Sequence, residues 1–130
     1  MVEKLRRPAV LESKTTEVLT GCGNLFVIVG SLGGKIVEIF ATLGKAGGCS
    51  LCQNEALCRS ISLGLRHGVP AREYIKGLMS IQCPRPSGFG QARVLSCPDA
   101  IAKVLRLTVE ENGRGIVQGE YGEADNTEEV

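Results

Sequence analysis

Six cysteines are the residues of this chain whose type and spacing could support chemistry. Cys49 and Cys97 stand at predicted helix starts, whereas Cys22 lies between two glycines and Cys83 precedes a proline. Unpaired N–H groups at a helix start favour the thiolate over the thiol, and the thiolate is the form that binds metal. We therefore expect these four cysteines to supply the ligands of a tetrahedral metal site.

The spacing of the four cysteines leaves the bound group open. They are 27, 34 and 14 residues apart, which matches no zinc-finger pattern. Four thiolates suit either Zn²⁺ or an iron–sulfur cluster, and we expect Zn²⁺, with the cluster as the alternative. A further interpretation is that the four are small buried side chains, as free cysteines often are.

The two remaining cysteines lie inside the helix predicted after Cys49. Cys58 falls on an apolar stripe of that helix, which predicts a core position. Cys52 forms a CxxC pair with Cys49 at the helix start, the arrangement of a dithiol redox site, but it also fits a second apolar stripe. We expect Cys52 to be a core residue and keep the redox dithiol as the alternative.

Two strands must position Cys22. Residues 15–29 are rich in β-branched side chains, and residues 35–43 alternate between polar and apolar. The segment between them, GSLGG at 30–34, contains residues that tolerate positive φ. We expect an antiparallel hairpin, extended by a further strand near residues 10–14.

Three helices must position the other cysteines. Each begins at a recognisable cap or proline: a Ser50/Gln53 capping box, Pro70, and a Ser96–Asp99 box. We expect the first helix to end near His67 with Gly68 as its stop, the second to span about ten residues, and the third to end near Leu107. The first should pack on two faces, because it has two apolar stripes, one of Leu57, Ile61 and Leu65 and one of Cys52, Ala56 and Leu63.

Composition and charge define one small body and a tail. The 130 residues are 43% hydrophobic and 22% charged, as in globular proteins. Residues 1–107 contain 14 Lys and Arg against 7 Asp and Glu, whereas residues 108–130 contain one against 7. We expect a single α+β domain over 1–107, with an antiparallel hairpin or small sheet packed with about three helices. The acidic segment 108–130 should be mobile from Asn112 onward.

Several protein classes are disfavoured by the same composition. No apolar run approaches the roughly 18 residues of a membrane span, and the start of the chain lacks a secretory signal, so we expect a cytoplasmic protein without a membrane partner. Aromatic residues make up 4% of the chain, too few for a base-stacking surface, so a nucleic-acid partner is not expected. The excess of Lys and Arg over Asp and Glu in residues 1–107 is nevertheless compatible with a third function, a regulator that binds nucleotides or nucleic acid.

Four segments together resemble the TSCPD domain family: RRPAVLESKTTEVLTGCGNLFVIV, FATLGKAGGCSLCQNEALCRSISLGLRHGV, IKGLMSIQCPRPS and VLSCPDAIAKVL. The resemblance covers about residues 6–105, and the motif that names the family reads LSCPD at 95–99. This family is best known as a C-terminal domain of adenosylcobalamin-dependent (class II) ribonucleotide reductases, and it also occurs as small free-standing proteins. The resemblance marks Cys22, Cys49, Cys83 and Cys97 as the family's recurring cysteines.

The resemblance implies an accessory role. The catalytic barrel of the reductase, with its radical cysteine and cobalamin site, cannot fit in this chain, so we do not expect it to reduce ribonucleotides alone. We expect a non-catalytic module with a structural zinc site that docks on a larger enzyme subunit or forms a homo-oligomer. The alternative is an electron-transfer or thiol-redox subunit that uses an iron–sulfur cluster or the Cys49/Cys52 dithiol.

Overall fold

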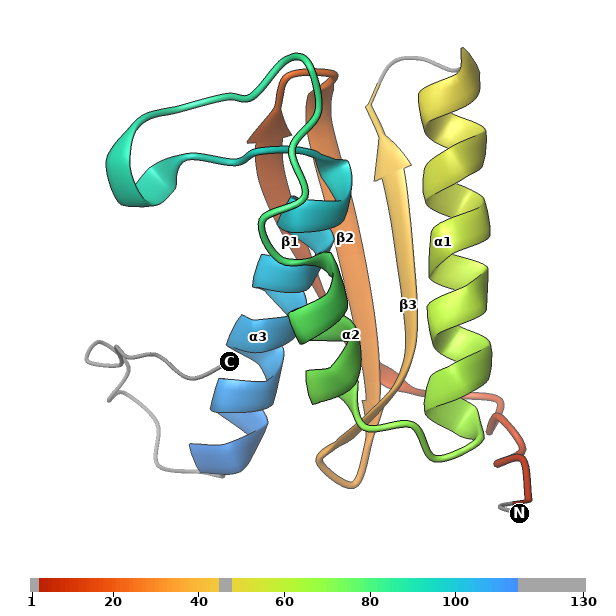
Figure 1. The fold of residues 1–130 in the computed structure, drawn as a ribbon. Coiled ribbons are helices and arrows are strands. Elements are labelled where there is room, and N and C mark those ends of the chain that lie inside the picture. Colours follow the sequence, from red (N-terminus) through yellow and green to blue (C-terminus); the bar gives the residue numbers. More distant parts are fainter. Residues whose placement is uncertain (1–2, 45–47, 115–130) are drawn as a thin grey trace.

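A three-stranded antiparallel sheet forms the centre of the computed structural model, which describes residues 3–44 and 48–114 (Figure 1). The strands β1 (Glu12–Thr20), β2 (Gly23–Leu32) and β3 (Lys35–Leu43) lie in the order β1-β2-β3. The helices α1 (Gly48–Arg66), α2 (Ala71–Leu78) and α3 (Cys97–Arg114) follow, with a short 3-10 helix at Gly90–Ala92. This confirms the predicted small α+β domain.

The hairpin between β2 and β3 forms where the sequence predicts it. Gly33 and Gly34 have φ values of +61° and +82°. Two successive positive φ values produce a tight turn whose twist matches the flanking strands, and glycine adopts them without a steric cost. Leu32 and Lys35 therefore pair directly across the turn.

A second hairpin, between β1 and β2, was not predicted. The strand expected over residues 15–29 is divided at Gly21 and Cys22, and the strand expected near 10–14 is the beginning of β1. The Thr20 side chain closes the turn, because its Oγ1 donates to the Gly23 carbonyl at 2.8 Å and accepts from the Cys22 N–H at 3.1 Å. Cys22 is thereby placed at the tip of a tight turn.

One face of the sheet forms the core with α3. Alternate residues of β2 point to this face, and α3 contacts all three strands while α2 packs against α3 (Figure 1). The sheet and α3 contribute these buried core residues: Leu25, Val27, Val29, Ile39, Ala41, Ile101, Val104 and Leu105. On the opposite face, Ile28 is half-buried and Phe40 is exposed, so this face is only partly covered.

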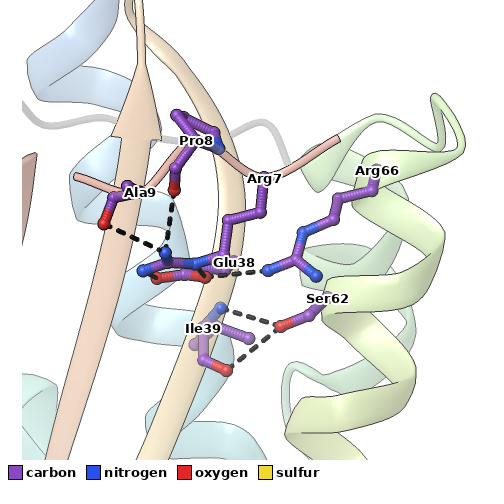
Figure 2. Close-up of polar contacts among 7 residues, drawn as sticks. All are labelled: Arg7, Pro8, Ala9, Glu38, Ile39, Ser62 and Arg66. Carbon is purple, nitrogen blue, oxygen red and sulfur yellow. Dashed lines mark hydrogen bonds and ion pairs between the residues drawn. The ribbon is translucent and has the colours of Figure 1, made fainter. Parts of the chain in front are cut away.

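The helix α1 lies along the outer edge of β3 (Figure 1). The Ser62 Oγ accepts from the Ile39 N–H at 2.9 Å and donates to the Ile39 carbonyl at 3.2 Å (Figure 2). Ser62 therefore satisfies backbone groups that a neighbouring strand would otherwise bind, which protects the edge from pairing with another chain.

Only one face of α1 is buried in the described part of the chain. Its core residues are Cys58, Ile61 and Leu65, and Leu57, the third member of the first predicted stripe, is partly buried against them. The second stripe is exposed at all three of its positions, Cys52, Ala56 and Leu63. The expectation of two packed faces is wrong, because the sheet edge covers α1 from one side.

The helix boundaries differ from the predictions in two places. The helix α1 begins at Gly48, so Ser50 lies within its first turn and is not its cap, although its end at Arg66 is within one residue of the expected end. The helix α3 continues to Arg114, well past Leu107. Residues 112–114 of the segment predicted to be mobile are thus helical, and residues 115–130 lie outside the described residues.

Candidate functional site

The β1–β2 turn brings two of the predicted ligands together. The Cys22 Sγ lies 3.6 Å from the Ser50 Oγ in the first turn of α1, and the Cys97 Sγ lies 3.9 Å from the Thr20 Oγ1. The Cys22 thiol is also close enough to Cys97 to raise its pKa. Two cysteines 75 residues apart in the sequence are therefore neighbours in the fold.

The loop that carries Cys83 packs on the same turn. A Cβ atom at Gly21 would collide with the backbone carbonyl of Arg85, so the loop approaches the turn as closely as backbone atoms permit. The Arg85 N–H donates to the Cys83 Sγ at 3.3 Å, and the Cys83 N–H donates to the Leu95 carbonyl at 3.0 Å. Since Leu95 lies two residues before Cys97, the loop is held between the turn and the start of α3.

Cys49 lies at the start of α1, next to Ser50, whose hydroxyl contacts Cys22 in the β1–β2 turn. It is exposed, and so is Cys52, whose thiol donates to the Cys49 carbonyl at 3.5 Å. The expectation that Cys52 is a core residue is therefore wrong, because its side of α1 faces solvent. The CxxC pair instead presents two accessible thiols.

The structure thus brings Cys22 and Cys97 together and holds the segments of Cys49 and Cys83 at the same end of the fold. Within residues 3–44 and 48–114, no group of three or more His, Cys, Asp or Glu side chains is close enough to hold a metal ion. The assignment of all four cysteines as ligands of one metal ion therefore remains a prediction.

Burial is the largest influence on the pKa of Cys97. Its side chain is 8% exposed, and burial raises its pKa above the ordinary value. Hydrogen bonding from Asn54 and Thr20 acts in the opposite direction, and the nearby Cys22 thiol raises the pKa further. The effect of burial therefore outweighs the hydrogen bonds that favour the ionised form of Cys97.

Cys58 differs from these cysteines in its surroundings. It is 2% exposed, and burial raises its pKa to about 12. It lies in the hydrophobic core, as its position on the apolar stripe predicts.

The LSCPD motif builds the start of α3. The Ser96 Oγ accepts from the Asp99 N–H at 3.1 Å, which confirms the predicted cap, and donates to the Ile81 carbonyl at 2.6 Å. Ser96 thereby joins the helix start to the loop, because one hydroxyl bonds to both. The Cys97 side chain is fixed between this cap and the β1–β2 turn.

Asp99 holds both ends of the loop over residues 80–95. Its buried carboxylate accepts the Ser80 N–H at 2.8 Å and the Leu95 N–H at 3.0 Å, and it pairs with the Lys103 Nζ at 3.0 Å. Burial acts to raise the pKa of Asp99, but the two backbone hydrogen bonds and Lys103 outweigh it, so the pKa is lowered. Asp99 thus places Cys83 relative to Cys97.

A second polar cluster lies on the partly covered sheet face (Figure 2). The Glu38 carboxylate accepts from the Arg7 Nε at 2.7 Å and from the Arg66 Nη2 at 2.8 Å, and its side chain is 3% exposed. Hydrogen bonding from Arg7 is the largest cause of a lowered pKa of Glu38, against the opposing effect of burial. This cluster joins the N-terminal segment, β3 and α1, and no local sequence signal predicts it, because its members are about 30 residues apart.

A groove of about 820 Å³ lies between β3 and α1 on this face. Phe40 and Leu63 line it, and each is 50% exposed. The Arg7–Glu38–Arg66 cluster also lines it. The groove therefore combines accessible apolar side chains with charged groups.

The sequence analysis also missed the polar residues around the two neighbouring sulfurs. Asn54 is 4% exposed and acts on Cys97, as Thr20 does, while Ser50 contacts Cys22. The position of Asn54 four residues before Cys58, on the buried face of α1, is the sequence signal that could have identified it.

Comparisons with known proteins agree with the resemblance noted from the sequence. None of the described helices has the length and apolar character needed to cross a membrane. A search among curated proteins and a search among solved structures each gave no match. The family model of the TSCPD domain matches residues 2–109 of the 130. The chain therefore belongs to the TSCPD domain family.

Proposed function

We propose that this chain is a non-catalytic accessory module with a structural zinc site formed by Cys22, Cys49, Cys83 and Cys97. The observation that carries the proposal is that Thr20 links Cys22 and Cys97, because its Oγ1 accepts from the Cys22 N–H at 3.1 Å and lies 3.9 Å from the Cys97 Sγ. The two cysteines come from a β-turn and a helix start that are far apart in the sequence. Ions with thiolate ligands commonly join segments in this way, because each ligand comes from a different element.

Two further contacts support the remaining ligands. The Cys22–Ser50 contact holds the start of α1, and with it Cys49, at the β1–β2 turn. The close approach of Gly21 and Arg85 holds the loop that carries Cys83 at the same β1–β2 turn. Zinc binding would require the Cys49 and Cys83 sulfurs to turn toward the other two, and a structural site of this kind contributes on the order of 10 kcal/mol at neutral pH.

A bound cation also fits the electrostatics of the site. Burial raises the pKa of the Cys97 thiol above its ordinary value. A divalent ion would supply the positive charge that stabilises neighbouring thiolates and would displace their protons. Zinc binding should therefore release protons and weaken as the pH falls.

Metal content and stability test the zinc site. We expect stoichiometric zinc in the wild-type chain purified under reducing conditions, measured by elemental analysis. Cys97→Ser should lose most of the zinc and several kcal/mol of stability, because it removes a ligand. Cys58→Ala is the matched control: it should retain the zinc and lose about 1–2 kcal/mol through a small cavity. Equal effects of the two substitutions would contradict the proposed ligand set.

We further propose that the module docks on a larger enzyme of the class II ribonucleotide reductase type. The groove between β3 and α1 supports a docking role, because the half-exposed Phe40 and Leu63 lie beside charged groups, as in many protein interfaces. The assay is titration of the chain into the purified reductase of the same organism. Phe40→Asp should weaken binding, and Leu107→Asp, at an exposed leucine of α3, should not. Absence of binding by the wild type would refute this partner.

A thiol-redox subunit is the second candidate, and the exposure of both Cys49 and Cys52 favours it. Alkylation of the native reduced protein, read by mass spectrometry, tests this alternative. Rapid modification of both thiols in the zinc-loaded protein would favour the dithiol, because a cysteine bound to zinc is protected from alkylation. A brown protein that contains iron and sulfide would instead indicate an iron–sulfur cluster.

A further inference from the structure

The structure covers one edge of the central sheet and leaves the other open (Figure 1). At the β3 edge, α1 lies alongside and the Ser62 Oγ bonds to both backbone groups of Ile39. At the β1 edge, α3 approaches from the core face, where the Lys14 Nζ donates to the Glu111 Oε1 at 2.7 Å. Within the described residues, no backbone hydrogen bond joins β1 to a segment other than β2. The outer side of β1 is therefore available to another strand.

The register of the sheet identifies the backbone groups that point outward from β1. Because Ser62 binds the N–H and C=O of Ile39 at the β3 edge, Ile39 and its partner Val29 do not bond to each other. Val29 therefore directs its own N–H and C=O to β1, where Lys14 is its partner. Hydrogen-bonded pairs occur at every second residue of an antiparallel ladder. The residues of β1 whose backbone groups point away from the sheet are therefore Ser13, Thr15, Glu17 and Leu19.

These outward residues form an edge without the usual protection. All four are exposed, and Leu19 is 62% exposed. The strand has nine residues, contains no proline and pairs with β2 in one unbroken register. Proteins commonly protect such edges with short strands, prolines, bulges or a covering element, because unpaired N–H and C=O groups attract further strands. Lys14, the one lysine of β1, is directed to the core face by its bond to Glu111.

A second copy of β1 matches this edge over its whole length. Thr16 is the midpoint of β1, so a two-fold axis at Thr16 pairs the whole strand with its copy in an antiparallel ladder. Ser13 then lies opposite Leu19 of the second copy, and Thr15 lies opposite Glu17 of the second copy. Both pairs occur twice by symmetry, and each exchanges two backbone hydrogen bonds, which gives about eight bonds in total.

Charge favours this register over its neighbours. With the axis at Thr16, Lys14 faces Val18 and Glu17 faces Thr15, so no two like charges are directly opposed. An axis at Lys14 or at Glu17 would place that residue opposite its own copy, and directly opposed like charges are destabilising. The two Thr16 residues face each other instead, and threonine pairs across strands are favourable. The strand is therefore complementary to its own copy in charge as well as in backbone geometry.

We propose that the chain forms a two-fold homodimer in which the β1 strands of two copies pair edge to edge and join the two sheets into one. The exposed Leu19 then lies against the second copy, and two-fold dimers are the commonest assemblies of identical chains. The dimer requires no metal and leaves the groove between β3 and α1 free at the opposite edge. It therefore goes beyond the zinc module and its docking role.

The molar mass of the full-length reduced chain in solution tests the dimer. Sedimentation equilibrium should give twice the monomer mass of 13.8 kDa, with a decrease toward the monomer on dilution. Thr15→Pro removes an outward N–H from each copy, and proline is tolerated at a strand edge where that N–H is not bonded within the sheet. It should raise the dissociation constant about 10-fold or more, because two interface hydrogen bonds are lost. Thr15→Val keeps the N–H and is the matched control, which should leave the dissociation constant unchanged.

A second variant acts through a side chain and leaves the backbone intact. Leu19→Lys places a charge on the outer edge and should favour the monomer at concentrations where the wild type is a dimer. Leu107→Lys, at a comparably exposed leucine of α3, should not. Far-ultraviolet circular dichroism and urea unfolding of each variant establish that the monomer is folded.

A disulfide trap reports the register of the two strands. The two residues at the axis form a non-hydrogen-bonded pair with Cα atoms about 4.5 Å apart, which a disulfide can span. Thr16→Cys under mild oxidation should therefore yield a covalent dimer, with a link between the two introduced thiols identified by peptide mass spectrometry. Ser13→Cys is the control that should not link to its own copy, because the two Ser13 residues lie at opposite ends of the interface.

The results separate this dimer from the proposed function. A wild-type chain with the monomer mass at every concentration up to its solubility limit would overturn the dimer, whether or not zinc is bound. A dimer that survives both Thr15→Pro and Leu19→Lys, without a link in Thr16→Cys, would show that another surface joins the copies and would also overturn the β1 pairing. A β1 dimer in a chain that binds no zinc would refute the zinc site alone.

Discussion

Replacement of Asp99 is the most direct perturbation of the loop that carries Cys83. The Asp99 side chain is 1% exposed and accepts the backbone N–H groups of Ser80 and Leu95. Ser80 has a φ of +71°, an uncommon conformation for a residue other than glycine, so the hydrogen bond from its N–H helps to fix a strained position. Asp99→Ala would leave both N–H groups without their acceptor, and Lys103 would keep only its hydrogen bond to the Arg93 carbonyl.

The size of the effect follows from these contacts. A hydrogen bond to a charged group contributes about 1.5–3 kcal/mol, so the loss of two predicts a decrease of about 3–6 kcal/mol in the free energy of unfolding. Lys103 is partly exposed and can be hydrated, so we add nothing for this ion pair. Asp99→Asn keeps one acceptor oxygen and should cost about 2 kcal/mol.

The pH dependence provides an independent check. Because the pKa of Asp99 is lower in the folded protein than its ordinary value of 3.8, its ionised form stabilises the fold. This stabilisation is present above pH 3.8 and is lost as the pH falls through the lower, folded-state pKa. Asp99→Asn should therefore show a weaker loss of stability in acid than the wild type.

Urea unfolding monitored by far-ultraviolet circular dichroism is the suitable assay, because the chain contains no Trp. The measurement should be made at neutral pH and below pH 4, with a chelator present so that metal does not contribute. An Asp99→Asn protein as stable as the wild type at neutral pH, with the same acid dependence, would refute the role assigned to this carboxylate.

The remaining predictions concern the second polar cluster and the β1–β2 turn. Glu38→Gln should lower the free energy of unfolding by about 2–4 kcal/mol, measured by urea unfolding. Because the folded-state pKa of Glu38 is lowered, the variant should also lose less stability than the wild type as the pH falls below 4.5. The control Glu55→Gln, in an exposed ion pair, should change the free energy of unfolding by less than about 0.5 kcal/mol. A Glu38→Gln protein with unchanged stability would argue against the cluster. Gly21→Ala should displace the loop at Arg85 and lower zinc affinity, whereas Gly77→Ala, in an open position of α2, should stabilise the protein by up to about 1 kcal/mol. Equal zinc affinities of these two variants would show that the close approach at the turn does not position the site.

Local signals made part of the fold predictable. The glycine pair of the β2–β3 turn and the serine cap of α3 act through their own backbone and their nearest neighbours, so the sequence predicts them correctly. The β1–β2 turn escaped prediction because β-branched residues continue on both sides of Gly21 and Cys22. The extension of α3 beyond Leu107 escaped it because Thr108 is buried by its packing in the fold, which composition does not reveal.

The candidate site divides in the same way. The sequence by itself determined the family, the number of cysteines and the helix start at Cys97, since each depends on residues that are adjacent or fixed in order. Only the tertiary structure decided that Cys22 and Cys97 lie on either side of Thr20, that Cys52 faces solvent and that Asn54 is buried. The first outcome depends on how α3 packs on the sheet, and the other two depend on which side of α1 lies against the edge of β3. Both are chosen by packing between elements distant in the chain.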